Sequence, residues 1–166
     1  MNVSSSYIKK CIYELEELTE KDRPYTRLVF SKEFKEARNW LTNQFKNLDL
    51  DIKIDNAGNL IGIYKSFNKS SKKVLIGSHL DTVPFGGRFD GIAGVVSSLA
   101  IVKNFREKNI ELPFDIELYD YLGEELNEWG MSCIGTRGMA GFLDEEFLNR
   151  KDSLGRVLKD EINKIG

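Results

Sequence analysis

Apolar residues recur along this chain with two different spacings, which together predict alternating helices and strands. Residues 5–20 and the stretch after Ser31 carry apolar side chains three or four positions apart, which is typical of helices with one buried face. Ser31 is a preferred N-cap residue, and Pro24 lies in the polar break between the two helices. The residues expected inside are Ile8, Ile12, Leu15 and Leu18 in the first helix, and Phe34, Ala37, Leu41 and Phe45 in the second.

Shorter runs with the character of strands follow. Residues 52–55 and 60–64 flank an Asn-Ala-Gly-Asn turn and predict a hairpin. The polar residues 66–73 are expected to form a loop, and the unbroken apolar run at 74–76 predicts a strand covered on both faces. Alternation of apolar and polar residues predicts another strand at 114–119.

Two further stretches, residues 91–105 and 153–165, have helical periodicity. Helices that alternate with strands after an early hairpin predict an α/β fold, a layered domain with a mixed β-sheet flanked by helices. Sheets of this kind bind ligands at the carboxyl ends of their strands. The residues expected to face inward are Ile92, Val95, Val96, Leu99 and Val102 in the first of these helices, and Leu154, Val157, Leu158, Ile162 and Ile165 in the second.

Composition narrows the class of protein. A chain of 166 residues with a net charge of −2 is expected to be one domain, and the charge argues against nucleic acid or an anionic membrane as the main partner. No apolar run approaches the about 18 residues of a membrane-spanning helix, and no signal peptide is visible. Cys11 and Cys133 lie far apart and are expected to be free thiols of a cytoplasmic protein.

The first candidate for chemistry is His79, the only histidine of the chain, which follows the strand at 74–76. A neutral imidazole is a good ligand for zinc-like ions, and its second ring nitrogen usually donates to a carboxylate or carbonyl. Asp81, two residues further on, is a candidate to orient the ring. The alternative is a histidine that is satisfied within the core, and a His-x-Asp triplet alone does not exclude it.

Two acidic clusters complete the candidate site. Asp90 lies among glycines, where the backbone can approach a ligand closely, although an Asp before a helix is also a common N-cap. Glu124 and Glu125 follow the strand at 114–119 and would repel each other without a cation, although a solvated acidic loop is the alternative. Because their side chains point in different directions, one can bind metal while the other transfers protons.

In combination these residues resemble the M20-type metallohydrolases, and most closely the hydantoinase/carbamoylase amidases. That branch includes N-carbamoyl-L-amino-acid hydrolases, ureidoglycolate-type hydrolases and allantoate amidohydrolases. Residues 126–130, after the two glutamates, depart from the family's pattern. The matching segments, which span nearly the whole chain, are residues 77–84, 87–91 and 124–125, supported by residues 26–31, 55–60 and 132–138.

The resemblance implies a role for each site residue. His79 would bind one of two divalent metal ions, Asp90 would bridge both, and Glu125 would bind the second. Zinc or manganese is expected, with cobalt or nickel as alternatives. Glu124 would be the general base and Asp81 would orient the histidine. A cis peptide bond after Asp90 is also implied.

The resemblance further implies that residues 1–166 are the N-terminal part of a metallopeptidase-like catalytic domain. The lid or dimerisation domain and the C-terminal half, with both remaining histidine ligands, would be absent, so the metal site would be incomplete and the chain weakly active or inactive. The expected reaction is hydrolysis of a linear amide or carbamoyl C–N bond in a small amino-acid-like substrate. The alternatives are another branch of the family, an aminopeptidase or deacylase, and a non-catalytic remnant that associates with its own copies. Full-length relatives are expected to dimerise.

Overall fold

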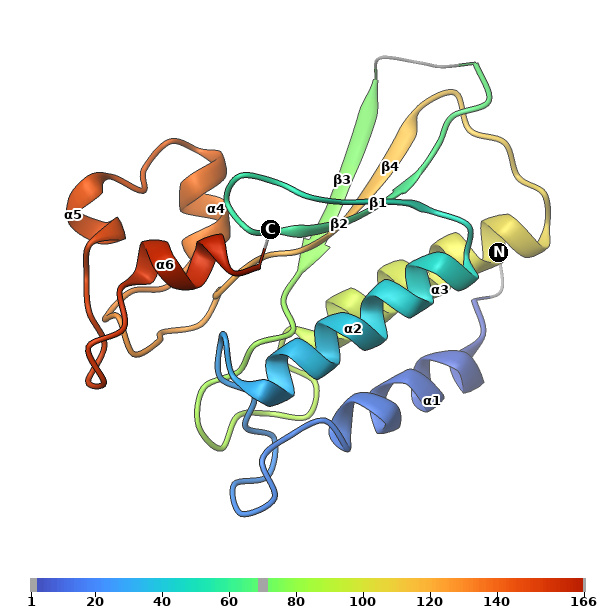
Figure 1. Cartoon of the computed structure of the whole chain (residues 1–166). Helices are drawn as coiled ribbons and strands as arrows, with labels where there is room; N and C mark the ends of the chain where they lie inside the picture. The colour runs from blue at the N-terminus through green and yellow to red at the C-terminus, as the bar shows by residue number, and fades with distance from the viewer. Residues whose placement is uncertain (1–2, 69–71, 166) are drawn as a thin grey trace.

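The computed structural model describes residues 3–68 and 72–165, and its centre is a four-stranded sheet with the strand order β1-β2-β4-β3 (Figure 1). β2 pairs antiparallel with β1 and β4, whereas β3 pairs parallel with β4. This mixed sheet with flanking helices confirms the predicted fold class. The strands are β1 (Asp51–Ile54), β2 (Leu60–Tyr64), β3 (Lys73–Ser78) and β4 (Asp115–Asp120).

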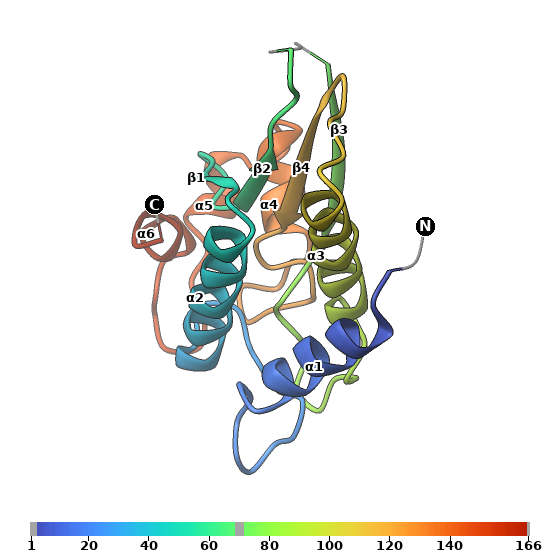
Figure 2. The same cartoon turned by 90° about the vertical axis from the view of Figure 1, so that its right-hand side faces the viewer.

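Of the three long helices, α2 and α3 pack against one side of the sheet, and α1 packs on α3. In Figure 2, α2 and α3 lie next to each other, and α1 crosses below α3. Side-chain caps begin two of them, because Ser4 and Ser31 each accept a hydrogen bond from a backbone N–H three residues on. The long helices are α1 (Ser5–Glu16), α2 (Lys32–Asn47) and α3 (Ile92–Glu107).

Three short helices gather beside the turn of the β1–β2 hairpin (Figure 1). They are α4 (Ile134–Met139), α5 (Glu145–Leu148) and α6 (Leu158–Asn163). Close approach needs small residues here, since a Cβ on Gly138 would lie 2.6 Å from Cβ of Ala57. The sequence patterns did not predict α4 and α5, because each is too short to show a helical period.

The main core lies between the sheet and the long helices. The apolar residues predicted to face inward in α2 and α3 are all buried there, among them Phe34, Leu41 and Leu99. Gly62 of β2 packs directly on Phe45, and a Cβ at this position would come within 2.7 Å of that ring. The alternation of β2 therefore sends Leu60 and Tyr64 toward the helices and Ile61 and Ile63 to the opposite face of the sheet.

Two predicted helices are shorter than expected. α1 ends at Glu16 because Arg27 binds the carbonyl oxygens of Leu15 and Leu18, where the helical ladder would otherwise continue. α6 begins only at Leu158, because the chain before it forms a turn around the carboxylate of Asp152. Leu154, which was expected to face inward, is consequently 77% exposed.

The prediction that residues 74–76 are covered on both faces is wrong. β3 is an edge strand of the described sheet, and Val74 and Leu75 are each 43% exposed. An apolar run indicates the capacity to be buried, but only neighbouring elements can supply the cover. The expected loop at 66–73 overlaps residues 69–71, which lie outside the described residues, and β3 already begins at Lys73.

In the described part of the chain, no helix is both long and apolar enough to cross a lipid bilayer.

Candidate metal centre

The carboxyl ends of two neighbouring parallel strands bring the predicted site residues together. Ser78 at the end of β3 is in register with Asp120 at the end of β4. His79 follows the first strand directly, and Glu124 and Glu125 lie on the loop that follows the second. The site therefore lies at the edge of the sheet where the fold class places ligands.

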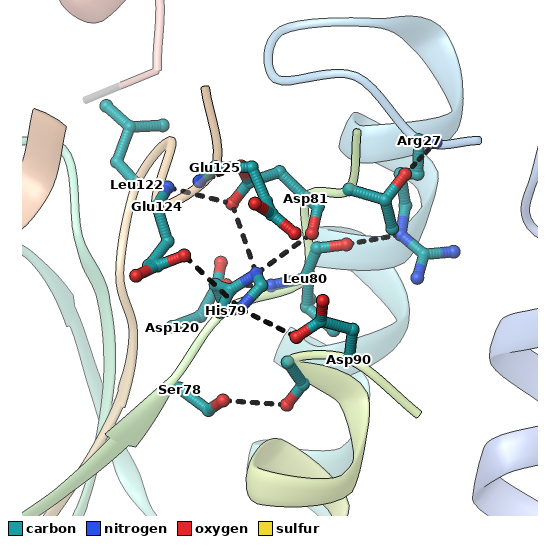
Figure 3. A network of polar contacts seen from close by, with 12 residues as sticks. Arg27, Ser78, His79, Leu80, Asp81, Asp90, Asp120, Leu122, Glu124 and Glu125 are labelled. Carbon is teal, nitrogen blue, oxygen red and sulfur yellow. Dashed lines mark hydrogen bonds and ion pairs between the residues drawn. The ribbon is translucent and has the colours of Figure 1, made fainter. Parts of the chain in front are cut away.

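The three predicted metal ligands converge on one point (Figure 3). His79, Asp90 and Glu125 each offer a ligand atom, and these atoms all lie within 4.8 Å of one another. The Nε2 atom of His79 lies 3.8 Å from Oδ1 of Asp90 and 3.5 Å from Oε2 of Glu124. Glu124 thus lies beside the three ligands and faces the same ring nitrogen.

The acidic groups crowd one another. Burial raises the pKa of Glu125 above its ordinary value, and the negative charge of Asp90 raises it further. A divalent cation relieves this kind of repulsion, and a set of one imidazole nitrogen and several carboxylate oxygens suits zinc, manganese and related ions. The residues present therefore fit such an ion.

The imidazole of His79 is buried and held in one orientation. Its Nδ1 atom lies 2.9 Å from the backbone oxygen of Asp81 and 3.8 Å from the carboxylate oxygen Oδ1 of the same residue. The backbone carbonyl is thus the nearer partner of the ring, and it leaves Nε2 directed at the acidic cluster.

The Asp81 carboxylate has different partners. Its two oxygens accept hydrogen bonds from the backbone N–H groups of Glu124 at 3.2 Å and Glu125 at 3.1 Å. Asp81 is 1% exposed, and burial raises its pKa to about 6 against the opposing effect of these hydrogen bonds. Asp81 therefore ties the loop that carries the two glutamates to the strand end that carries His79.

Asp90 is placed by the turn that leads into α3. Gly91 is the N-cap residue, with φ 65° and ψ −48°, and no side chain caps this helix, so the alternative interpretation of Asp90 as an N-cap is wrong. The Asp90–Gly91 peptide bond is trans, contrary to the implied cis bond, in keeping with the cost of about 2.5–4 kcal/mol for a cis bond at a non-proline residue. The hydroxyl of Ser78 donates to the Gly91 carbonyl at 2.7 Å and fastens the turn to β3.

Several polar residues near the site were not among the sequence-based candidates. The thiol of Cys133 lies 3.7 Å from Oε1 of Glu124. Arg27, Arg38 and Asp120 are buried next to the segment that carries His79. Arg27 lies in a stretch that contributed to the family resemblance, but no spacing rule connects these residues to the site because the chain brings them from separate elements.

Comparison with known proteins places these features in context, although no known family model matches the chain. The chain is 35% identical over 141 residues to an N-carbamoyl-L-amino acid amidohydrolase of Geobacillus stearothermophilus. The aligned region covers 85% of this chain and 34% of that protein. It is 26% identical to the allantoate amidohydrolase of Bacillus subtilis over 87% of this chain and 35% of that protein. A solved hydantoinase/carbamoylase family amidase from Burkholderia vietnamiensis superimposes with a TM-score of 0.91 at 26% identity, over 99% of this chain and 40% of that one.

The chain therefore spans between 34% and 40% of the length of these relatives. They confirm the resemblance that the sequence motifs predicted.

Proposed function

Because the homologues that cover this chain are N-carbamoyl-L-amino acid amidohydrolases, an allantoate amidohydrolase and hydantoinase/carbamoylase amidases, we propose that it supplies part of the active site of a metal-dependent amidohydrolase. The substrate would be a small amino-acid-like molecule, and the bond cleaved a linear amide or carbamoyl C–N bond. The observation that carries the proposal is the convergence of His79, Asp90 and Glu125, with Glu124 beside them. In this proposal residues 1–166 form the N-terminal part of the catalytic domain.

Two divalent metal ions, zinc or manganese in the first place, would occupy the centre. His79 and Glu125 would each hold one ion and Asp90 would bridge them, with further ligands from parts of the enzyme outside this chain. When bound, the ions supply Lewis acid chemistry, since they lower the pKa of water and polarise a carbonyl group. A bound cation would lower the raised pKa of Glu125 again, because its positive charge favours the ionised carboxylate.

Glu124 would transfer the proton. Its Oε2 atom lies on the same side of the site as Nε2 of His79, 39% of its side chain is exposed, and it is not one of the three converging ligands. The carboxylate would take a proton from water as the water oxygen bonds to the carbonyl carbon. It would then give that proton to the nitrogen as the C–N bond breaks, which leaves Glu124 ready for the next cycle.

A cavity of about 330 Å³ next to Asp81 and Thr82 offers space for a substrate side chain. Leu28, Pro84 and Trp129 make its wall mainly apolar. N-carbamoyl amino acids with apolar side chains are therefore the first substrates to test, against peptides and N-acyl amino acids. Hydrolysis of peptides or acyl derivatives alone would favour the aminopeptidase or deacylase branch instead.

The chain by itself is proposed to be weakly active or inactive, because His79 is its only histidine and three side chains make an incomplete pair of metal sites. Self-association is the second candidate property, and the exposed edge strand with Val74 and Leu75 favours it. Size-exclusion chromatography tests it, and a monomer at high concentration would count against it. The free thiols Cys11 and Cys133 agree with the proposed cytoplasmic location.

Calorimetric titration with Zn²⁺ and Mn²⁺ tests the metal centre. We expect binding to the wild-type chain and its loss in His79→Ala and Asp90→Asn. Asp49→Asn is the matched control for the loss of one negative charge, because the Asp49 side chain is 96% exposed and belongs to another surface. Variants that bind as well as wild type would refute the proposed centre, whereas a folded wild-type chain that binds neither ion would mean that these three side chains need the further ligands.

A further inference from the structure

Leu80 separates His79 from Asp81, and buried charged side chains hold its backbone from both directions (Figure 3). We propose that Asp120 and Arg27 are positioning residues, which fix the peptide groups of Leu80 and thereby set the orientation of the His79 ring. Only the consequence for metal affinity rests on the proposed function. The orientation of the ring is a property of the metal-free chain.

Asp120 holds the first side of this residue. It is the last residue of β4 and is fully buried, and its Oδ1 atom accepts a hydrogen bond from the Leu80 N–H at 2.8 Å. Its Oδ2 atom accepts a hydrogen bond from Nε of Arg38 at 2.7 Å, and Arg38 also donates to the Gly58 carbonyl at 2.7 Å. Both oxygens of the buried carboxylate are therefore engaged, and its position is determined by the sheet and by α2 together.

Arg27 holds the opposite side. Its Nε atom donates to the Leu80 carbonyl at 2.6 Å, and its Nη1 atom donates to the carbonyls of Leu15 and Leu18 at 2.9 and 2.8 Å. The residue is 2% exposed, and the hydrogen bonds of its guanidinium go to carbonyls, while the charges of Asp120 and Asp81 act on it from a longer distance. Burying a cation that has only carbonyl partners is costly, so a fixed geometry at Leu80 is the gain that this arrangement offers.

The constraint passes from Leu80 to the rest of the centre. The regular pairing of β3 with β4 stops at Ser78, so the strand ladder alone does not hold the next residues. Fixing the two Leu80 peptides places the Cα of Asp81, and the Thr82 N–H, which donates to the Arg27 carbonyl at 3.0 Å, holds the next peptide. The carbonyl of that peptide belongs to Asp81 and binds Nδ1 of the His79 ring at 2.9 Å. It also places the Asp81 carboxylate, which receives the N–H groups of the loop with the two glutamates. One clamped residue therefore positions most of the centre.

His79 allows a direct test because it is the only histidine, so its ring gives one set of nitrogen signals in a long-range ¹⁵N–¹H spectrum. We expect the metal-free wild-type chain, at a pH where the ring is neutral, to show a proton on Nδ1 and a bare Nε2. In Asp120→Ala and Arg27→Gln, the ring should lose this preference and show a mixture of the two tautomers. Asp152→Asn is the matched control, because the buried Asp152 carboxylate pairs with the partly exposed Arg156 outside this network, and it should keep the wild-type signals.

Metal affinity provides the second measurement. Zn²⁺ or Mn²⁺ binding should weaken at least tenfold in both clamp variants and remain unchanged in Asp152→Asn. Asp120→Asn retains an acceptor for the Leu80 N–H and should restore the wild-type tautomer at least in part, and it serves in place of Asp120→Ala if that variant does not fold. Folded clamp variants that keep a single Nδ1–H tautomer would overturn the inference. A wild-type chain that binds no metal would overturn the expected effect on metal affinity, while the ring spectra would still decide the positioning role.

Discussion

Gly91 is the position where one added methyl group should damage the site most. A Cβ at this residue would lie 2.4 Å from the His79 carbonyl oxygen and 2.6 Å from Cε1 and Nδ1 of its ring. None of these atoms can move freely, because the carbonyl belongs to the backbone and the ring is held by Asp81. The backbone of Gly91, with φ 65° and ψ −48°, also lies outside the regions that other residues adopt readily.

Both effects can be given magnitudes for Gly91→Ala. The strained backbone should cost about 1–3 kcal/mol of unfolding free energy. Overpacking against His79 should cost a further 1–3 kcal/mol or so. Because relief of the contact requires the ring to move, Zn²⁺ affinity should also fall at least tenfold. Urea denaturation and calorimetric titration measure the two quantities separately.

The variant Gly130→Ala separates the cost of backbone strain from the cost of the contact with His79. Gly130 has a φ of 69°, but a Cβ there would meet no atom within 4 Å. This variant should therefore lose some stability from the backbone alone and bind metal as wild type does. If Gly91→Ala were no less stable than Gly130→Ala and kept the wild-type metal affinity, the reasoning about the packing of His79 on this turn would be refuted.

Four further predictions follow from the same structure. In any preparation that hydrolyses a carbamoyl substrate, Glu124→Gln should keep metal binding but lower kcat by about 10²–10⁴-fold, as measured by product release. Leu99→Ala should cost about 2–5 kcal/mol in urea denaturation because Leu99 is fully buried in the core, and a loss near zero would contradict this. Asn59→Ala should cost about 1–3 kcal/mol, since its buried side chain accepts from the Leu122 N–H and that donor would be left without its partner. The pKa of Asp81 in the folded chain is about 6, above the ordinary 3.8, so between these pH values the folded metal-free chain binds a proton that the unfolded chain does not. The unfolding free energy from urea denaturation should therefore rise through this group as pH falls from about 7 toward 4. Asp81→Asn should not show this rise.

The fold class could be predicted from the sequence, because the spacing of apolar residues indicates which side chains can be buried together. The stripes of α2 and α3 were predicted residue by residue, since each helix has one face against the sheet. The same reasoning failed at 74–76, because an apolar run does not reveal whether anything covers it. It also overextended the last helix, where the local hydrogen bonds of Asp152 form a turn instead.

The candidate site shows the same division. Residue type and position after a strand indicated His79 and Glu125, and a carboxylate among glycines before a helix indicated Asp90. The structure brings all three within reach of one ion. The sequence could not show that the carboxylate of Asp81 binds the loop of the two glutamates. Nor could it identify Arg27 and Asp120 as positioning residues, because both bind backbone atoms of Leu80. Every residue has these backbone groups, so no residue type indicates such a contact.

The parallel pairing of β3 with β4 has a consequence for the order of folding. Their connection runs through the whole of α3, so the two strands can pair only after this long segment has closed, whereas the helices and the β1–β2 hairpin depend on local contacts. The ligand groups lie just beyond the ends of these two strands, so the centre should be among the last parts of the molecule to assemble. In a refolding experiment, metal capture should therefore lag behind the recovery of helical signal. An ion present throughout should slow unfolding and leave the rate of folding nearly unchanged.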